Sequence, residues 1–460
     1  MIVKRDCLRG ESMIENGLCS LWSGIRATYG MNQGRIAYQI KIRRHIHCSE
    51  LLNNETPFGI RIGWSVDGNK FCLGKQSLSY GYEQSGKFWT KNQFEWYGEQ
   101  YSIGDIITCY ADFESEPGNV LLSFAKNDLN FNLAYRINYK DLYFRPLFPH
   151  IFIKNLSFQV NFGQLNIKYP LRSGFHFINN YHEDERIRGI LQPSSKEECE
   201  VIMMVGLPAA GKSLWIERHC AIYTDKKYVI LSTNNIIKQM NIDDCDGNSE
   251  MIDRAVQCLK AILDKAVCQK RNFIIDQTNV FGNARRRKMS LFDGFFRRAV
   301  VVIPNNNEYE RRRHQQQIEQ DKFTPDLFIN EMKSYSKKYI KYKHKNIYIY
   351  ILAKFDLPEV GDVFDDVEYA ELAFREARDL VMYYRQQSQI VEEILRKNNK
   401  RKRKENYSIH SKKNNQKSIQ FNDNRNDHNI QLSFRHKNFS SQSYSKQHHY
   451  HSRRRHMNYN

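Results

Sequence analysis

Eight consecutive residues of this 460-residue chain have the types and spacing of a phosphate-binding loop. They follow the pattern G-x-x-x-x-G-K-[ST] and run Gly206, Leu207, Pro208, Ala209, Ala210, Gly211, Lys212 and Ser213. In such a loop the glycines let successive backbone N–H groups cradle phosphates. The lysine reaches the β- and γ-phosphates, and the serine hydroxyl takes Mg²⁺. The segment therefore predicts binding of ATP together with Mg²⁺.

An acidic residue is needed to hold the outer shell of the metal, and Asp276, which directly follows the apolar run 273–275, is the candidate. The carboxyl end of a parallel strand is where an α/β sheet presents its ligands. Two later groups of cations could clamp phosphates or contact RNA, and either could equally be a solvated helix face. These groups are Arg285, Arg286, Arg287 and Lys288, and then Arg311, Arg312 and Arg313.

The segments around the loop predict how it is positioned. Residues 201–205 form an apolar strand before the loop, and residues 214–221 continue after it as a helix. Further buried strands are expected at 228–231, 272–275 and 299–303, separated by helix-length segments such as 251–270. Strands that alternate with helices indicate βαβ units and a parallel sheet. A long helical pattern follows over residues 367–397.

The first third of the chain has a different pattern. Between about residues 21 and 163, short runs of alternating polar and apolar residues are broken by Gly, Asn and Asp, which favours an antiparallel β-sandwich. The predicted organisation is multidomain. It comprises a β-sandwich at 1–165, a polar linker at 166–198, a P-loop α/β domain at 199–356, a helical extension at 357–397 and a disordered basic tail at 398–460.

The charge of the chain is concentrated at its end. The whole chain carries a formal net charge of +19, and residues 401–460 hold 14 Lys and Arg against 3 Asp and Glu, a net +11. Basic residues neutralise phosphates and interspersed aromatic residues stack on unpaired bases, so we expect RNA binding by this tail. A solvating tail or an import signal is the alternative, and residues 400–404 would serve as a nuclear signal. The basic residues are Lys400, Arg401, Lys402, Arg403, Lys404, Arg453, Arg454 and Arg455.

The ten cysteines form no C-x-x-C pair and have no spacing suited to zinc, so we expect reduced core thiols. No run approaches 18 apolar residues, and the first residues have no apolar signal region. We therefore expect an intracellular protein that does not bind a membrane.

Several motifs together resemble the family of heterogeneous nuclear ribonucleoprotein U. The likeness to its SPRY domain rests on the segments RIGWS at 61–65, LSYGY at 78–82, YGE at 97–99, FAKN at 124–127 and RPLFPH at 145–150. The phosphate-binding loop and the segment IIDQTNV at 274–280 follow in that family's order. The resemblance implies a nuclear, RNA-binding and ATP-binding protein of pre-mRNA processing and chromatin organisation. It also implies a SPRY domain that binds a protein partner, and suggests self-association that depends on ATP.

The chain departs from the family in three respects. The amino-terminal SAP helices are not matched, which suggests a truncated start, and the tail lacks the family's Arg-Gly-Gly box. The P-loop domain also resembles the kinase half of polynucleotide kinases, whose catalytic base aligns here with Asn234. A neutral amide cannot act as a general base near pH 7. The alternative function, a 5′-hydroxyl polynucleotide kinase or an ATPase, would need another base, such as Asp225, Asp243 or Asp244.

Overall fold

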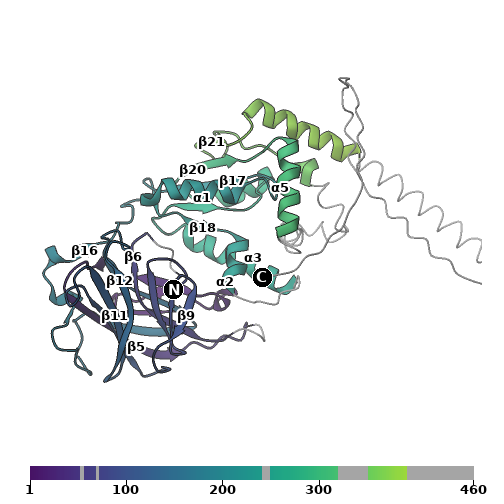
Figure 1. The fold of residues 1–460 in the computed structure, drawn as a ribbon. Helices are drawn as coiled ribbons and strands as arrows, with labels where there is room; N and C mark the ends of the chain where they lie inside the picture. The colour runs from purple at the N-terminus through teal and green to yellow at the C-terminus, as the bar shows by residue number, and fades with distance from the viewer. Residues whose placement is uncertain (52–55, 69–71, 241–248, 320–350, 391–460) are drawn as a thin grey trace, which may run out of the picture. The chain divides into compact units, whose positions relative to one another are not determined.

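The computed structural model describes residues 1–51, 56–68, 72–240, 249–319 and 351–390 (Figure 1). The predicted tail at 398–460, with all of its basic residues, lies outside these ranges. Within them, no helix combines the length and the apolar character that crossing a membrane requires.

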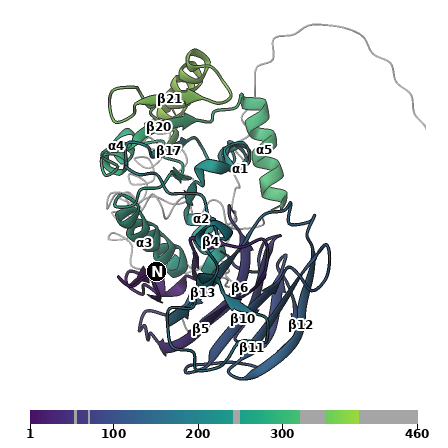
Figure 2. The same cartoon turned by 90° about the vertical axis from the view of Figure 1, so that its left-hand side faces the viewer.

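The predicted antiparallel β-sandwich is confirmed, and its first sheet is built around the long strand β5. Hydrogen bonds connect the strands in the order β1-β2-β14-β5-β10-β11-β12, and β15 adds a parallel pairing to β5. Four of these strands, β5, β10, β11 and β12, can be followed in Figure 2. The bounds are β1 Ile2–Val3, β2 Arg9–Glu11, β5 Arg35–His45, β10 Ile106–Asp112, β11 Asn119–Lys126, β12 Leu129–Asn138, β14 Leu156–Asn161 and β15 His176–Phe177.

The second sheet of the sandwich has the order β3-β13-β6-β7-β8-β9. Inward-facing apolar side chains of the two sheets, such as Tyr38, Trp64 and Phe124, form one buried core. A separate small sheet pairs β4 with β16. The bounds are β3 Ser23–Arg26, β4 Tyr29–Gly30, β6 Gly59–Val66, β7 Ser79–Glu83, β8 Lys87–Thr90, β9 Gln93–Trp96, β13 Leu147–Lys154 and β16 Ile187–Arg188.

The predicted polar linker at 166–198 is more structured than its composition indicates. It contains β15, β16 and two 3₁₀ turns, η2 Ile178–Asn180 and η3 Glu183–Glu185. The cause is a small number of apolar residues within a polar stretch. Phe177 and Ile178 are buried, and Phe175 packs edge to face on Tyr110 with ring centroids 4.8 Å apart.

The predicted parallel sheet is also confirmed, with the strand order β18-β19-β17-β20-β21. Its central strand, β17, leads directly into the phosphate-binding loop, and β19 lies beside it with Met203 opposite Ile275. The bounds are β17 Glu200–Val205, β18 Val229–Leu231, β19 Phe273–Ile275, β20 Phe296–Val301 and β21 Asp366–Tyr369.

Helices cover both faces of this sheet. Side chains from one face, including Ile202 and Met204, pack against Ile216 of α1, and those from the other face, including Met203, pack against helices later in the chain. The loop after β17 therefore lies at the end of a strand that is buried on both sides. The helices are α1 Lys212–Ile222, α2 Thr233–Met240, α3 Ser249–Ala266, α4 Gly282–Met289 and α5 Asn306–Glu319; two more helical stretches cover 351–354 and 374–390, and a 3₁₀ turn, η4, covers Thr224–Lys226.

The helix expected from residue 367 begins later. Residues 366–369 form β21, and the helix occupies 374–390. The physical reason is a change of period, because Val367 and Tyr369 alternate as in a strand while the apolar residues after 372 recur at helical spacing. β21 completes the sheet by pairing along the outer edge of β20.

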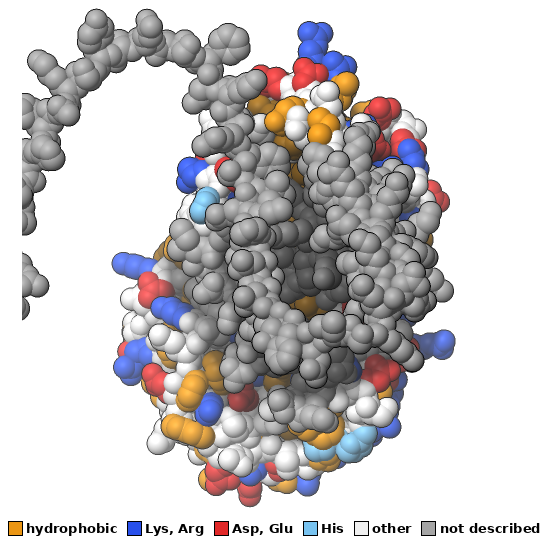
Figure 3. All heavy atoms as spheres, turned by 90° about the vertical axis from the view of Figure 1, so that its right-hand side faces the viewer, with side chains coloured by type: hydrophobic (Ala, Val, Ile, Leu, Met, Phe, Trp, Pro, Cys, Tyr) orange, Lys and Arg blue, Asp and Glu red, His pale blue; other side chains and the backbone are white. Residues whose placement is uncertain are grey.

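Charged side chains of both signs are mixed on the described surface drawn in Figure 3, where Lys and Arg lie among Asp and Glu. This agrees with the sequence, in which most of the excess positive charge falls in the tail.

Candidate functional site

The phosphate-binding loop turns sharply between β17 and α1. Ala209 and Gly211 have the left-handed φ values 63° and 105°. The Gly206 N–H donates to the carbonyl of Thr278 over 3.0 Å. A Cβ at Gly206 would lie 2.5 Å from the backbone carbonyl oxygen of Val302, so only glycine fits there. The loop ends at the first turn of α1, whose N–H groups and helix dipole favour an anion.

The side chain of Lys212 folds back onto the phosphate-binding loop. This side chain is buried, and its ammonium group donates to the carbonyls of Gly206 over 3.1 Å and Leu207 over 2.8 Å. These contacts place a positive charge at the concave side of the loop, where phosphate oxygens would lie.

The two predicted metal ligands are in contact. The Ser213 hydroxyl donates to Asp276 Oδ2 over 3.2 Å, and Asp276 directly follows β19. Burial raises the pKa of the Asp276 carboxyl, while the Lys212 charge and the Ser213 hydroxyl oppose that rise. A hydroxyl and a carboxylate are oxygen donors of the kind that Mg²⁺ prefers, so this pair fits the predicted ion.

The first predicted phosphate clamp has a different role for two of its members. Arg285 and Lys288 are buried on the inner face of α4, together with Ala284 and Met289. Lys288 donates to the side-chain oxygens of Gln277 and Asn279. These two cations therefore hold the loop after β19 rather than forming part of a solvated helix face, and the contact of this cluster with phosphate or RNA stays a prediction.

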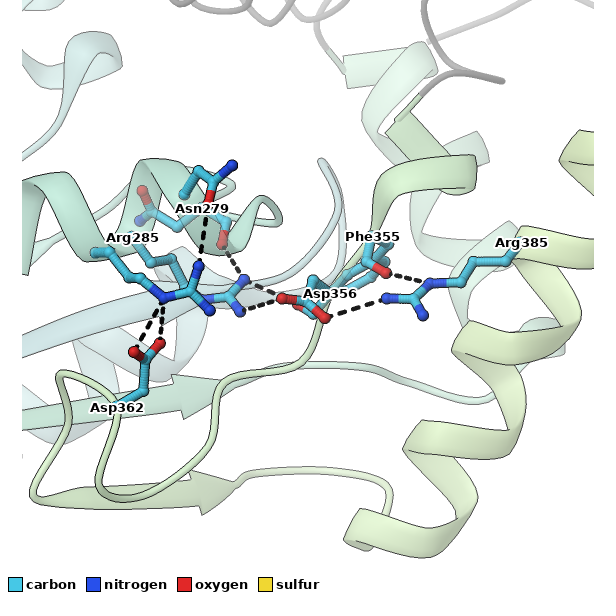
Figure 4. A network of polar contacts seen from close by, with 8 residues as sticks. Asn279, Arg285, Phe355, Asp356, Asp362 and Arg385 are labelled. Carbon is cyan, nitrogen blue, oxygen red and sulfur yellow. Dashed lines mark hydrogen bonds and ion pairs between the residues drawn. The ribbon is translucent and has the colours of Figure 1, made fainter.

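Arg285 belongs to a larger network that Figure 4 shows. Its Nη1 donates to the carbonyls of Asn279 over 3.1 Å and Asp356 over 2.8 Å, and its Nη2 donates to Asp356 Oδ2 over 3.3 Å. Arg385, from the helix at 374–390, donates to the Phe355 carbonyl and to Asp356 Oδ1. The exposed neighbour Arg286 donates to Asp362, and Arg287 is exposed.

Asn279 connects this network to the phosphate-binding loop. It has a left-handed φ of 45°, and its Nδ2 donates to the carbonyl of Met204 in β17 over 2.9 Å. The loop after β19 is thus tied to β17 next to the phosphate-binding loop, in addition to the bond from Gly206 N–H to Thr278.

The second predicted cluster places one arginine at the loop itself. Arg312 Nη1 donates to the Ala210 carbonyl over 2.6 Å and to Glu371 Oε1 over 2.7 Å, and Arg312 Nε donates to Glu308 over 2.7 Å. Arg311 pairs with the same carboxylate of Glu308 but is exposed and has no contact with the loop among its hydrogen bonds to the described residues. Arg312 is therefore the member of this cluster that contacts the phosphate-binding loop.

Asn234 is the residue that aligns with the catalytic base of polynucleotide kinases. Asn234 is exposed in the first turn of α2, after β18. Asp225 lies in η4, before β18, and therefore at the opposite end of the parallel sheet from the phosphate-binding loop. This placement argues against Asp225 as a substitute base, while Asp243 and Asp244 lie outside the described residues.

Sequence reasoning missed the acidic partners of the site arginines. Asp356 lies 71 residues after Arg285, and Glu371 lies 59 residues after Arg312. No local pattern marks either carboxylate. The burial of two of the cations does have a local signal. Arg285 and Lys288 are spaced i, i+3, on the same side of α4 as the buried Ala284 and Met289.

Two family models match the chain. The SPRY domain matches residues 44–165, and the AAA domain matches residues 201–338, which contain the phosphate-binding loop. Both matches lie within the predicted domains, whose own boundaries remain predictions.

The chain is also similar to curated proteins. It is 31% identical over 394 residues to heterogeneous nuclear ribonucleoprotein U-like protein 2 of Mus musculus, and 32% identical over 394 residues to that of Homo sapiens. Each match covers 84% of this chain and 50% of the relative, so the chain spans about half the length of these relatives. ATP-dependent RNA helicase DDX1 of Xenopus laevis is 27% identical over 196 residues, 43% of this chain and 24% of the helicase.

The resemblance that the motifs predict is thereby confirmed: the chain joins a SPRY domain to an AAA-type P-loop domain, and it is similar over most of its length to a protein of the heterogeneous nuclear ribonucleoprotein U family.

Proposed function

We propose that the chain is a nuclear RNA-binding ribonucleoprotein component whose P-loop domain binds ATP with Mg²⁺, acting in pre-mRNA processing and chromatin-associated RNA organisation. The observation that carries the nucleotide part is the contact between Ser213 and Asp276 at the end of the phosphate-binding loop. The RNA part is supported by the similarity to a ribonucleoprotein and by the basic, aromatic composition of the tail.

The P-loop residues divide the binding of ATP between them. The backbone N–H groups of the loop and the first turn of α1 bind the phosphates, and Lys212 neutralises their charge. Ser213 and Asp276 hold Mg²⁺, which screens the repulsion between phosphate oxygens. Arg312 donates to the Ala210 carbonyl of the loop, and Glu308 and Glu371 hold its guanidinium there.

The other parts of the chain bind macromolecules in this proposal. The tail at 398–460 binds single-stranded RNA through phosphate contacts and base stacking, with little sequence preference. The SPRY domain binds a protein partner, and ATP regulates self-association of the chain.

Phosphate transfer to RNA ends is the less favoured function. It requires a base beside the attacking hydroxyl, and Asn234 holds that position with an amide. Hydrolysis of ATP uses water as the nucleophile and therefore needs no RNA hydroxyl in the site.

One assay separates these functions. Purified full-length protein is mixed with γ-labelled ATP, Mg²⁺ and an RNA that bears a free 5′-hydroxyl. Lys212→Ala tests the loop, and Lys260→Ala, at an exposed position of α3, is the matched control.

We expect RNA retention on a filter with no label on the RNA, and ATP binding that Lys212→Ala alone removes. Label transferred to RNA by the wild type but not by Lys212→Ala would make the chain a kinase. Label released as free phosphate, again lost in Lys212→Ala, would add an ATPase activity.

A further inference from the structure

Three side chains that can bind a metal converge in the amino-terminal domain, away from the phosphate-binding loop. Ligand atoms of Cys19, Cys48 and Glu50 all lie within 4.8 Å of one another. Cys19 belongs to the 3₁₀ turn η1, Leu18–Ser20, while Cys48 and Glu50 follow β5. A spacing of 29 residues between the two cysteines matches no zinc motif, so the sequence alone does not indicate this cluster.

Backbone contacts hold the two segments together. The Gly17 N–H donates to Glu50 Oε2 over 2.9 Å, with Gly17 at a left-handed φ of 77° immediately before the turn. The Cys48 thiol contacts the Ile14 carbonyl at 3.9 Å, and the Glu50 N–H donates to Cys48 Sγ over 3.4 Å. A backbone N–H directed at sulfur stabilises a thiolate, the form of cysteine that binds metals.

The surroundings of Cys19 are buried and contain charged groups of both signs. The Cys19 side chain is fully buried. Its thiol lies beside Cys48 and Glu50, and Arg254 is the cation that interacts with it. Two thiolates and a carboxylate carry three negative charges, which a divalent ion would reduce to one, facing the Arg254 cation.

We propose that Cys19, Cys48 and Glu50 form a zinc site, with a water molecule as the fourth ligand on the exposed side of Glu50. Sulfur ligands disfavour Mg²⁺ and Ca²⁺, and the carboxylate disfavours Cu⁺. Tetrahedral zinc with Zn–S bonds of about 2.3 Å places its two sulfurs about 3.8 Å apart. In the structure the ligand atoms of the three residues are at most 4.8 Å apart, so a small movement of the side chains would bring them to these distances. The ion would connect η1 to the segment after β5.

Cobalt(II) is the probe, because a thiolate ligand gives it a near-ultraviolet charge-transfer absorption. Reduced full-length protein, freed of metal by a chelator, is titrated with Co²⁺ and then with Zn²⁺. We expect this absorption, release of two protons for each ion bound, and loss of the absorption when Zn²⁺ displaces Co²⁺. The oxygen ligands Ser213 and Asp276, and the histidines of the tail, have no sulfur and cannot produce this absorption.

Variants assign the absorption to the cluster. Cys48→Ser should abolish it, whereas Cys268→Ser, the same change at an exposed cysteine, should leave it intact. Glu50→Gln should keep the absorption but weaken Co²⁺ binding by roughly tenfold or more. Absence of the absorption in the wild type, or its persistence in Cys48→Ser, would overturn the proposal.

Thermal unfolding provides a second readout on the same proteins. Zn²⁺ should raise the melting temperature of the wild type and of Cys268→Ser, because an ion that binds only the folded state stabilises it. If Cys48→Ser does not fold, Glu50→Gln decides the question, since the exposed glutamine can still accept the bond from Gly17. An equal zinc response in wild type and Glu50→Gln would contradict a ligand role for Glu50.

Discussion

Ser213 and Asp276 lie 63 residues apart in the chain, and the Ser213 hydroxyl donates a hydrogen bond to Asp276 Oδ2 over 3.2 Å. The two residues come from neighbouring segments of the parallel sheet, one after β17 and the other after β19. Two oxygen donors of different types are thus held at one end of the phosphate-binding loop. This relationship makes the metal dependence of nucleotide binding a direct test of the site.

Replacement of the Asp276 carboxylate should weaken the Mg²⁺-dependent part of ATP binding. We expect Asp276→Asn to reduce the affinity for ATP in the presence of Mg²⁺ by roughly tenfold or more. The neutral amide cannot hold Mg²⁺ and its bound water as a carboxylate does. Affinity measured in a chelator should change much less. Titration with a fluorescent ATP analogue, with and without Mg²⁺, measures both. Asp293→Asn, at an exposed position before β20, is the control, and equal losses in the two variants would refute the assignment.

Arg285 and Arg286 are adjacent but should differ in their contribution to stability. Arg285→Lys should lower the free energy of unfolding by about 1–3 kcal/mol. The three acceptors on Asn279 and Asp356 are bound by two separate guanidinium nitrogens, whereas the donors of an ammonium group all leave one nitrogen and cannot span the same positions. Arg286→Lys, at an exposed ion pair, should change it by no more than about 0.5 kcal/mol. Urea unfolding followed by circular dichroism gives both values. Similar losses would show that the buried network does not stabilise the domain.

Glu308 should make a contribution to stability that disappears in acid. Hydrogen bonds from Arg311 and then Arg312 lower the pKa of its carboxyl from 4.5 to about 2. Because the folded-state pKa is the lower one, this contribution is fully present above about pH 4.5 and is lost as the pH falls towards 2. The difference in melting temperature between wild type and Glu308→Gln should therefore be constant near neutrality and shrink below pH 4.5. Glu310→Gln, at an exposed pair with Arg313, should give a much smaller difference throughout.

Removal of the tail should separate RNA binding from nucleotide binding. We expect deletion of residues 398–460 to abolish most RNA affinity while ATP affinity stays unchanged, because the phosphate-binding loop lies in another domain. For the intact chain, log K should fall with log salt by about 0.7 for each single-strand phosphate contacted. Filter binding at several salt concentrations measures both effects. RNA affinity that survives the deletion would place the RNA site in the folded part of the chain.

The sequence predicted the parts of the structure that depend on short segments. The phosphate-binding loop is one run of eight residues, and Asp276 follows its strand immediately, so both could be placed before any contact was known. The sandwich and the parallel sheet follow from periods of two residues and from apolar runs. These signals act over a few residues and do not require knowledge of distant partners.

The features that could not be predicted are contacts between residues that are distant in the chain. Arg285 and Lys288 belong to a run of four cations that resembles an exposed helix face, and their burial depends on Gln277, Asn279 and the distant Asp356. Residues 366–369 are too short a segment for their alternation to outweigh the helical period that follows, and their pairing with β20 joins segments about 68 residues apart. Cys19 and Cys48 meet only when η1 folds against the end of β5.

The position of β21 in the sequence also bears on how the protein is made. The ribosome releases the phosphate-binding loop and β20 well before residues 366–369, so during synthesis the outer edge of β20 presents unpaired N–H and C=O groups. During the same interval Arg312 has not yet met Glu371. An open strand edge invites pairing with another nascent chain. A premature stop codon between residues 302 and 366 would make that exposure permanent, so such truncated products should aggregate or be degraded.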